Sequence, residues 1–164
     1  MNLFLTTLLL AITLSSTAFG DDFRDGIAAY EKGDYKTTIE LWKPLAEQGN
    51  YSAQFNLGLM YARGDGVPED DKQAVKWYRL AAEQGDADAQ SNLGYMYDEG
   101  DGVSEDDKQA IKWYRLAAEQ GHAKAQYNLG VMYDYGSGVP EDYKQAAKWY
   151  QLAAEQARKI IYNI

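Results

Sequence analysis

The chain has 164 residues but no cysteine, and it contains only three prolines and one histidine. Without cysteine there are no disulfide bonds, so packing must stabilise the fold. With His122 as the only histidine, the sequence also argues against a zinc site. A Ser–His–Asp triad would have to use His122, which stands at a turn between two expected helices and is better explained as a surface residue. We therefore expect no cofactor and no enzymatic activity.

Positive charge is also scarce, because 16 lysines and arginines stand against 25 aspartates and glutamates, which gives a net charge of −9. Nucleic-acid binding depends mainly on contacts to phosphates, so this balance argues against DNA or RNA as a partner. It also argues against adsorption to anionic membranes. A solvated acidic surface explains the acidity, and a cationic partner is the alternative.

Residues 1–20 contain no ionisable side chain, and Leu3 to Leu14 is almost wholly apolar. This run is too short to span a bilayer comfortably. Small residues at Ala18 and Gly20 predict a signal peptide that is cleaved before Asp21, with an uncleaved anchor or a buried helix as the alternative. The absence of cysteine excludes a bacterial lipoprotein anchor. We expect an exported protein, periplasmic or else secreted, with no membrane insertion after cleavage.

The rest of the chain repeats itself every 36 residues. Residues 81–116 read AAEQGDADAQSNLGYMYDEGDGVSEDDKQAIKWYRL, and residues 117–152 read AAEQGHAKAQYNLGVMYDYGSGVPEDYKQAAKWYQL. A fixed period of this length is typical of a solenoid, in which each unit covers the apolar face of the next. We expect units at about 22–49, 50–85, 86–121 and 122–157, followed by a short tail.

Each unit is predicted to be a pair of antiparallel helices. In the unit at 50–85, Ala53, Leu57 and Met60 recur at helical spacing, and Gly64 ends the first helix. Asp70 is the expected N-cap of the second helix, and Gln73 would complete a capping box. The same pair recurs as Asp106 with Gln109 and as Asp142 with Gln145.

Glycines inside the first helices indicate close packing. A glycine in a helix costs up to about 1 kcal/mol, so we expect a bulky neighbour beside Gly58, Gly94 and Gly130. The recurring aromatic residues have helical spacing and are better explained as core than as a ligand-stacking surface. These residues are Tyr61, Trp77, Tyr78, Tyr97, Trp113, Tyr133 and Trp149.

The two ends differ from this pattern. The first unit, which includes Gly26 and Gly33, has a shorter turn with the spacing of a tetratricopeptide repeat. At the other end Ala157 replaces the glycine that ends the other second helices. We expect the last helix to run on, and an apolar tail with Ile160, Ile161 and Ile164 to fold over the final face.

The motifs A-x-x-N-L-G-x-M-Y, G-x-G-V and K-W-Y-x-L-A-A-E-Q occur in order within residues 53–85, 89–121 and 125–156. This pattern resembles the Sel-like repeat (SLR) family, a relative of tetratricopeptide repeats. The resemblance implies an all-α fold, an α/α right-handed superhelical solenoid of about four helix-turn-helix units, and a role as an adaptor or binding module. A cysteine-rich branch of the family has been described as penicillin-binding with weak β-lactamase activity, a pattern from which this chain departs.

Two apparent ligand motifs have simpler explanations. The strings at 64–66 and 100–102 lack the third glycine of a dinucleotide loop and follow no strand, so they are expected to be turns. The carboxylates of Asp101, Glu105, Asp106 and Asp107 do not have the spacing of an EF-hand loop, and capping explains Asp106. We therefore expect no metal site.

By analogy with tetratricopeptide repeats, the first helices should line the inner surface of the solenoid. The analogy also places Ala62, Asp98 and Asp134 on that surface. The residues expected to contact a partner, here called the inner set, are Phe55, Asn56, Leu59, Arg63, Ser91, Asn92, Tyr95, Glu99, Tyr127, Asn128, Val131 and Tyr135. Much of this set changes between units, so packing leaves those positions free. The asparagine is constant, and either it binds a peptide backbone or it makes an internal contact with a neighbouring loop.

The sequence therefore favours an exported, monomeric and non-catalytic protein that binds a peptide or protein partner in its concave groove. Two alternatives remain. One is a binder of penicillin or peptidoglycan fragments, or a weak β-lactamase, like the cysteine-rich branch. The other is a secreted factor that engages a host protein.

Overall fold

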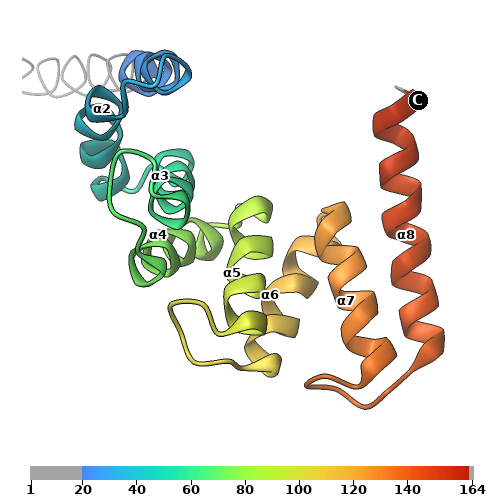
Figure 1. Cartoon of the computed structure of the whole chain (residues 1–164). Coiled ribbons are helices and arrows are strands. Elements are labelled where there is room, and N and C mark those ends of the chain that lie inside the picture. Colours follow the sequence, from blue (N-terminus) through green and yellow to red (C-terminus); the bar gives the residue numbers. More distant parts are fainter. Residues whose placement is uncertain (1–19, 163–164) are drawn as a thin grey trace, which may run out of the picture.

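The computed structural model describes residues 20–162, which contain helices and no strand (Figure 1). Residues 20–31 are helical. The helices that follow are α2 (Tyr35–Glu47), α3 (Tyr51–Arg63), α4 (Asp71–Glu83), α5 (Ala87–Glu99), α6 (Asp107–Glu119), α7 (Ala123–Tyr135) and α8 (Tyr143–Tyr162). Residues 1–19, which include nearly all of the expected signal peptide, lie outside the described residues, as does Ile164.

The helices form a solenoid, because each packs chiefly against its two neighbours in the chain. They follow an arc, with α3, α5 and α7 on the inner side and α4 and α6 on the outer side (Figure 1). The predicted all-α repeat solenoid is therefore confirmed. So is the prediction that first helices line the inner surface, from which the candidate site is built below.

The loops between the paired helices begin and end as predicted, with one difference. Gly64 ends α3 in the left-handed region at φ 70°, and the Asp70 carboxylate accepts a hydrogen bond from the Gln73 N–H at 3.0 Å. The reciprocal half of the predicted capping box is wrong. The Asp70 N–H donates to the Tyr61 carbonyl at 3.0 Å, because the loop folds back onto the last turn of α3. Asp106 and Asp142 do the same with Tyr97 and Tyr133.

The second glycine of each G-x-G string also has a packing role. Gly138 has φ +68°, and a Cβ added there would lie 2.6 Å from the Asp107 Cβ at the start of α6. Gly102 approaches the backbone of Asp71 at the start of α4 in the same way. Each loop therefore packs on the preceding unit, and only glycine combines this backbone conformation with this approach. The prediction that these strings are turns is confirmed.

The helical glycines pack against tyrosines. A Cβ added at Gly94 would lie 2.7 Å from the ring of Tyr114, and one at Gly130 would lie 2.8 Å from the ring of Tyr150. Gly58 faces Tyr78 in the same manner. The predicted bulky neighbour is thus the tyrosine of the second helix in the same unit.

The core lies at the junctions between units. One core cluster joins Tyr78 and Ala81 of α4 to Leu93 and Met96 of α5, and Trp113 of α6 closes it. The next cluster repeats this arrangement 36 residues later, from α6 to α8. Trp77 and Trp113 are only 6% and 7% exposed, which confirms that these tryptophans belong to the core. Burial of apolar side chains between units is therefore the main source of stability.

Both predicted departures at the ends are present in the backbone. The first unit has a short turn in which Gly33 has φ 75°, and α8 continues through Tyr162 as one helix of 20 residues. The side chains of Ile160 and Ile161 lie outside the described residues, as the whole of Ile164 does. The apolar tail therefore stays a prediction.

Candidate functional site

The inner surface of the arc carries a hollow of about 240 Å³ between α3 and α5. Leu59, Ala62 and Met96 contribute apolar surface, and Asn92 and Tyr95 add polar groups. The hollow brings together four members of the inner set and also residues from α4, the 100–106 loop and α7. The full lining, here called the inner hollow, is Leu59, Ala62, Arg63, Asp71, Tyr78, Asn92, Tyr95, Met96, Asp101 and Lys124.

Tyrosines are the exposed large hydrophobic side chains of the inner set. Tyr95, Tyr127 and Tyr135 are 41%, 55% and 76% exposed. The Tyr127 ring lies 5.5 Å from the Tyr150 ring, and the Lys124 ammonium lies 5.4 Å from the centre of the Tyr95 ring. Aromatic side chains that combine a large apolar ring with a hydroxyl are suited to protein interfaces.

The remaining members of the inner set vary in accessibility. Phe55 and Leu59 are half-buried and pack on the core cluster, with the Phe55 ring 6.0 Å from the Tyr78 ring. Arg63 and Glu99 are exposed, whereas Val131 is half-buried. Ser91 does not belong on an accessible surface, because it is only 1% exposed. Its small side chain stands where Phe55 and Tyr127 carry rings, and burial removes it from contact with a partner.

The surroundings of the constant asparagine differ between units. The Asn92 amide lowers the pKa of the Tyr78 hydroxyl, against the larger effect of burial, which raises it. Asn128 acts on Tyr114 in the same way. In the first of these helices Asn56 instead donates to the Ser52 carbonyl at 2.8 Å. At two positions the asparagine therefore acts on a buried tyrosine of the preceding unit, and its binding of a peptide backbone stays a prediction.

The carboxylates of the inner surface lack cationic partners. Asp98 accepts a hydrogen bond from the Tyr114 hydroxyl at 3.2 Å, and Asp134 accepts one from the Tyr150 hydroxyl at 3.4 Å. Burial raises the pKa of Asp98, and the hydrogen bond from Tyr114 only partly offsets this. Across residues 20–162, no lysine or arginine forms an ion pair with Asp98, Glu99, Asp101 or Asp134. The inner surface is therefore acidic and has tyrosines within it.

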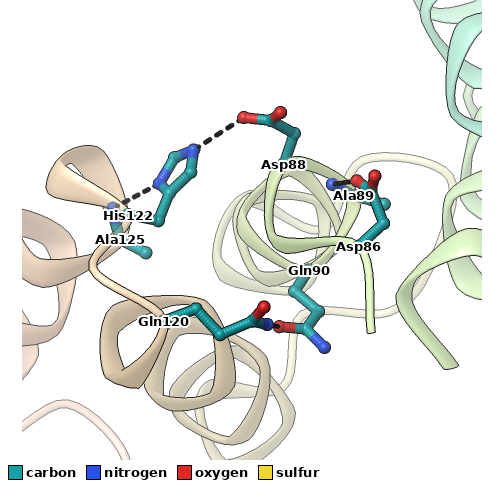
Figure 2. Close-up of polar contacts among 7 residues, drawn as sticks. All are labelled: Asp86, Asp88, Ala89, Gln90, Gln120, His122 and Ala125. Atoms are coloured by element: carbon teal, nitrogen blue, oxygen red, sulfur yellow. Dashed lines mark hydrogen bonds and ion pairs between the residues drawn. The ribbon is translucent and has the colours of Figure 1, made fainter. Parts of the chain in front are cut away.

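His122 is more than the surface residue that the sequence suggested. Its Nδ1 accepts a hydrogen bond from the Ala125 N–H at 3.2 Å, so His122 is the N-cap of α7. Its Nε2 lies 3.0 Å from an Asp88 carboxylate oxygen on α5 (Figure 2). Below this pair, Gln120 donates to the Gln90 side chain at 2.8 Å (Figure 2). His122 thus stabilises a junction between units, which a single histidine in a sequence does not reveal.

Two kinds of feature are absent from residues 20–162. This part of the chain contains no cluster of three or more histidine, cysteine or acidic side chains arranged to hold a metal ion. It also contains no helix with both the length and the apolar character needed to cross a membrane.

Comparison with known proteins identifies the repeat. A sequence profile described as Sel1 repeat matches residues 52–86, 87–122 and 123–157. The fold is similar to the crystal structure of c5321, a protective antigen of uropathogenic Escherichia coli strains that displays an SLR fold. That match has a TM-score of 0.82 and 42% sequence identity, and covers 90% of this chain and 32% of the other.

Two further relatives extend the comparison. A Sel1 repeat protein from Oxalobacter formigenes is 43% identical with a TM-score of 0.76, over 82% of this chain and 55% of the other. An exopolysaccharide production negative regulator from Rhizobium leguminosarum bv. viciae is 39% identical over 56 residues, which are 34% of this chain. The chain spans about a fifth of the length of the curated relatives it matches.

Proposed function

The chain belongs to the Sel1 repeat family, and we propose that it is an exported, non-catalytic adaptor that binds a peptide or protein segment on its inner surface. The observation that carries this proposal is the inner hollow, which has an apolar floor, exposed tyrosines and unpaired carboxylates around it. Repeat proteins use such extended concave surfaces for binding. The variation of the inner set between units supports the same proposal, since a surface that recognises one particular segment does not need identical units.

Binding is tested by removing the two exposed tyrosines of the central helices. In a pull-down from envelope extract, the double variant Tyr95→Ala with Tyr127→Ala is expected to lose the partner. Loss of interface aromatic residues costs about 2 kcal/mol or more, which is roughly a thirtyfold loss of affinity. Neither ring belongs to a core cluster, so the melting temperature and far-UV circular dichroism should stay near those of the parent.

The matched control is the double variant Tyr51→Ala with Tyr143→Ala. These tyrosines are 52% and 65% exposed and stand at the starts of α3 and α8, outside the inner set. The control should retain the partner. Equal loss in both variants, or retention in both, would place the binding surface elsewhere.

Export is supported by the uncharged and mostly apolar residues 1–20. Mass spectrometry of protein recovered from the envelope should show a chain that begins at Asp21. A full-length product in the cytoplasm would contradict export without bearing on the binding surface. The penicillin-binding alternative lacks a specific observation in its favour, since the cysteines of that branch are absent.

A further inference from the structure

Tyr95 stands at the centre of the inner surface among carboxylates. Asp98 and Glu99 follow it by three and four residues on α5, which places them on the same helix face. Asp101 lines the inner hollow together with Tyr95. The charge of Glu99 is the main reason that the pKa of the Tyr95 hydroxyl is raised, with smaller contributions from burial, Asp101 and Asp98. An exposed aromatic ring is thus bordered by three acidic side chains.

A cation already lies at this position. Lys124 reaches across from α7, and its ammonium group lies 5.4 Å from the centre of the Tyr95 ring. Electron-rich ring faces attract cations, and nearby carboxylates add to that attraction. Lys124 forms no ion pair with the carboxylates named above, so it does not neutralise them by direct contact. A cation thus lies over this ring within the chain itself, and the neighbouring carboxylates stay without an ion-pair partner.

Arg63 is the other cation that lines the inner hollow. Among the described residues it forms no ion pair with Asp98, Glu99 or Asp101. Direct contact with Arg63 therefore does not neutralise these carboxylates, which fits a partner of opposite charge.

From this geometry we infer that the segment bound on the inner surface is cationic, with a lysine or arginine side chain over the Tyr95 ring between Glu99 and Asp101. This inference rests on the proposed function, because it names the chemistry of the partner for the same surface. The apolar floor of the inner hollow, which includes Leu59 and Met96, would receive an apolar side chain next to the cation. Unpaired carboxylates then gain a partner, and water is displaced from an apolar surface.

The test uses labelled peptides of equal length that are lysine-rich, neutral or glutamate-rich, each with interspersed leucine. Fluorescence anisotropy measures their binding to the mature chain. We expect the lysine-rich set to bind best. The variant Glu99→Gln with Asp101→Asn should bind it roughly five- to tenfold more weakly, and the effect should shrink at high salt.

The control variant is Glu83→Gln with Glu119→Gln, which removes the same net charge from exposed positions at the ends of α4 and α6. It should leave binding nearly unchanged. If both variants weaken binding equally, the attraction comes from the overall negative charge and the inference is wrong.

The variant Lys124→Ala should change the affinity for the lysine-rich peptides in the opposite direction. Removal of a competing cation should strengthen binding of the lysine-rich peptides by roughly two- to fivefold, the value of an exposed cation–π contact. Weaker binding in this variant would indicate an acidic partner and overturn the inference.

The outcomes separate the two proposals. If neutral or acidic peptides bind best and depend on Tyr95 and Tyr127, the inner surface is a binding site but its partner is not cationic. If no peptide set binds, or if binding does not depend on these tyrosines, the proposed function fails and the inference fails with it.

Discussion

Residues 86–121 and 122–157 are two copies of one unit in different surroundings. In the part of the chain that the structure describes, the first, here the interior unit, is followed by another unit, and the second, here the terminal unit, is followed by none. Within each hairpin the glycine lies similarly close to the tyrosine, since a Cβ added at Gly94 or Gly130 would lie 2.7 Å or 2.8 Å from the ring. Yet Tyr114 is fully buried, whereas Tyr150 is half-buried. Packing within a hairpin therefore depends on the hairpin itself, but the next unit is needed to bury its tyrosine fully.

The sequence differs where the surroundings differ. Ile111 is buried at the forward face of the interior unit, and Ala147 takes its place on the terminal unit, where it is exposed. Arg115 donates to the Tyr133 hydroxyl of the following unit at 2.8 Å, whereas Gln151 donates to Glu155 of its own helix at 3.1 Å. At these two positions the terminal unit thus has a smaller apolar side chain and no donor to another unit, and among the described residues no further unit packs there.

The two units are expected to differ most in the free-energy cost of introducing a charged side chain at equivalent positions. Ala118 is 2% exposed in the junction after the interior unit, and its equivalent Ala154 is exposed. Ala118→Asp places an unpaired carboxylate in the core and should cost about 3 kcal/mol or more. Ala154→Asp should change the free energy of unfolding by less than about 0.5 kcal/mol. Urea denaturation measures both, and equal costs would show that the terminal face is covered.

A smaller difference in stability is expected when the helical glycines are replaced by leucine. Gly94→Leu forces α5 away from Tyr114, which has no free space, and should cost about 1–3 kcal/mol. In Gly130→Leu the new side chain contacts Tyr150, whose ring can move toward solvent. The loss of stability should therefore be at the low end of that range or below it. Thermal unfolding monitored by circular dichroism compares them. An unchanged melting temperature for Gly94→Leu would mean that the contact is not tight.

The third expected difference concerns tyrosine ionisation, so it is not seen at neutral pH, where these tyrosines are uncharged. Burial raises the pKa of Tyr78 to about 12, raises that of Tyr114 further, and raises that of Tyr150 as well. Since the folded-state pKa of Tyr78 exceeds its ordinary value of about 10, the neutral ring contributes stability below about pH 10, which is lost as the pH rises through about 12. An alkaline titration followed by tyrosinate absorbance should show Tyr150 of the terminal unit ionising before unfolding, and Tyr114 of the interior unit, like Tyr78, only with unfolding. Replacing each tyrosine in turn with phenylalanine removes its step from the titration curve and so assigns each step to a residue.

The sequence predicted the fold because its signals are local and repeated. The period of 36 residues, the ends of helices at Gly64 and Asp70, and the close packing at Gly94 all depend on neighbours in the chain or in the same hairpin. The reciprocal half of the capping box was predicted but does not form, because the Asp70 N–H has a competing acceptor, the Tyr61 carbonyl, which the loop brings close.

The candidate site was less predictable because its contacts cross from unit to unit. Analogy placed Tyr95 and Tyr127 on the inner helices, where both are exposed, but it also placed Ser91 there, which is buried. Lys124 was missed because its contact with Tyr95 spans two units, and no spacing within one repeat indicates it. The role of Asn92 was left open for the same reason, since its partner Tyr78 belongs to the preceding unit.

The smallest expected effect concerns the junction between the interior and terminal units. The N-cap of a first helix is Asn50 at α3, Asp86 at α5 and His122 at α7, so this position is chemically different in each unit. His122 both caps α7 and contacts Asp88 of the interior unit (Figure 2). Because Nδ1 accepts from the Ala125 N–H, Nε2 carries the proton and donates to the Asp88 carboxylate.

Two substitutions separate these contributions. His122→Ala removes the cap and the contact with Asp88, and should cost about 1 kcal/mol. His122→Asn keeps a capping oxygen, as Asn50 does for α3, and should lose only the exposed contact, worth a few tenths of a kcal/mol. Amide hydrogen exchange should show faster opening of α7 and α8 in the alanine variant, with little change in α5. The reason is that α7 is held at its start by this cap and, in the described chain, has only α8 after it, whereas α5 is packed between neighbouring helices of the units on both sides. Equal exchange in the two variants would show that the cap contributes nothing, and the difference between the interior and terminal units would then depend on apolar burial alone.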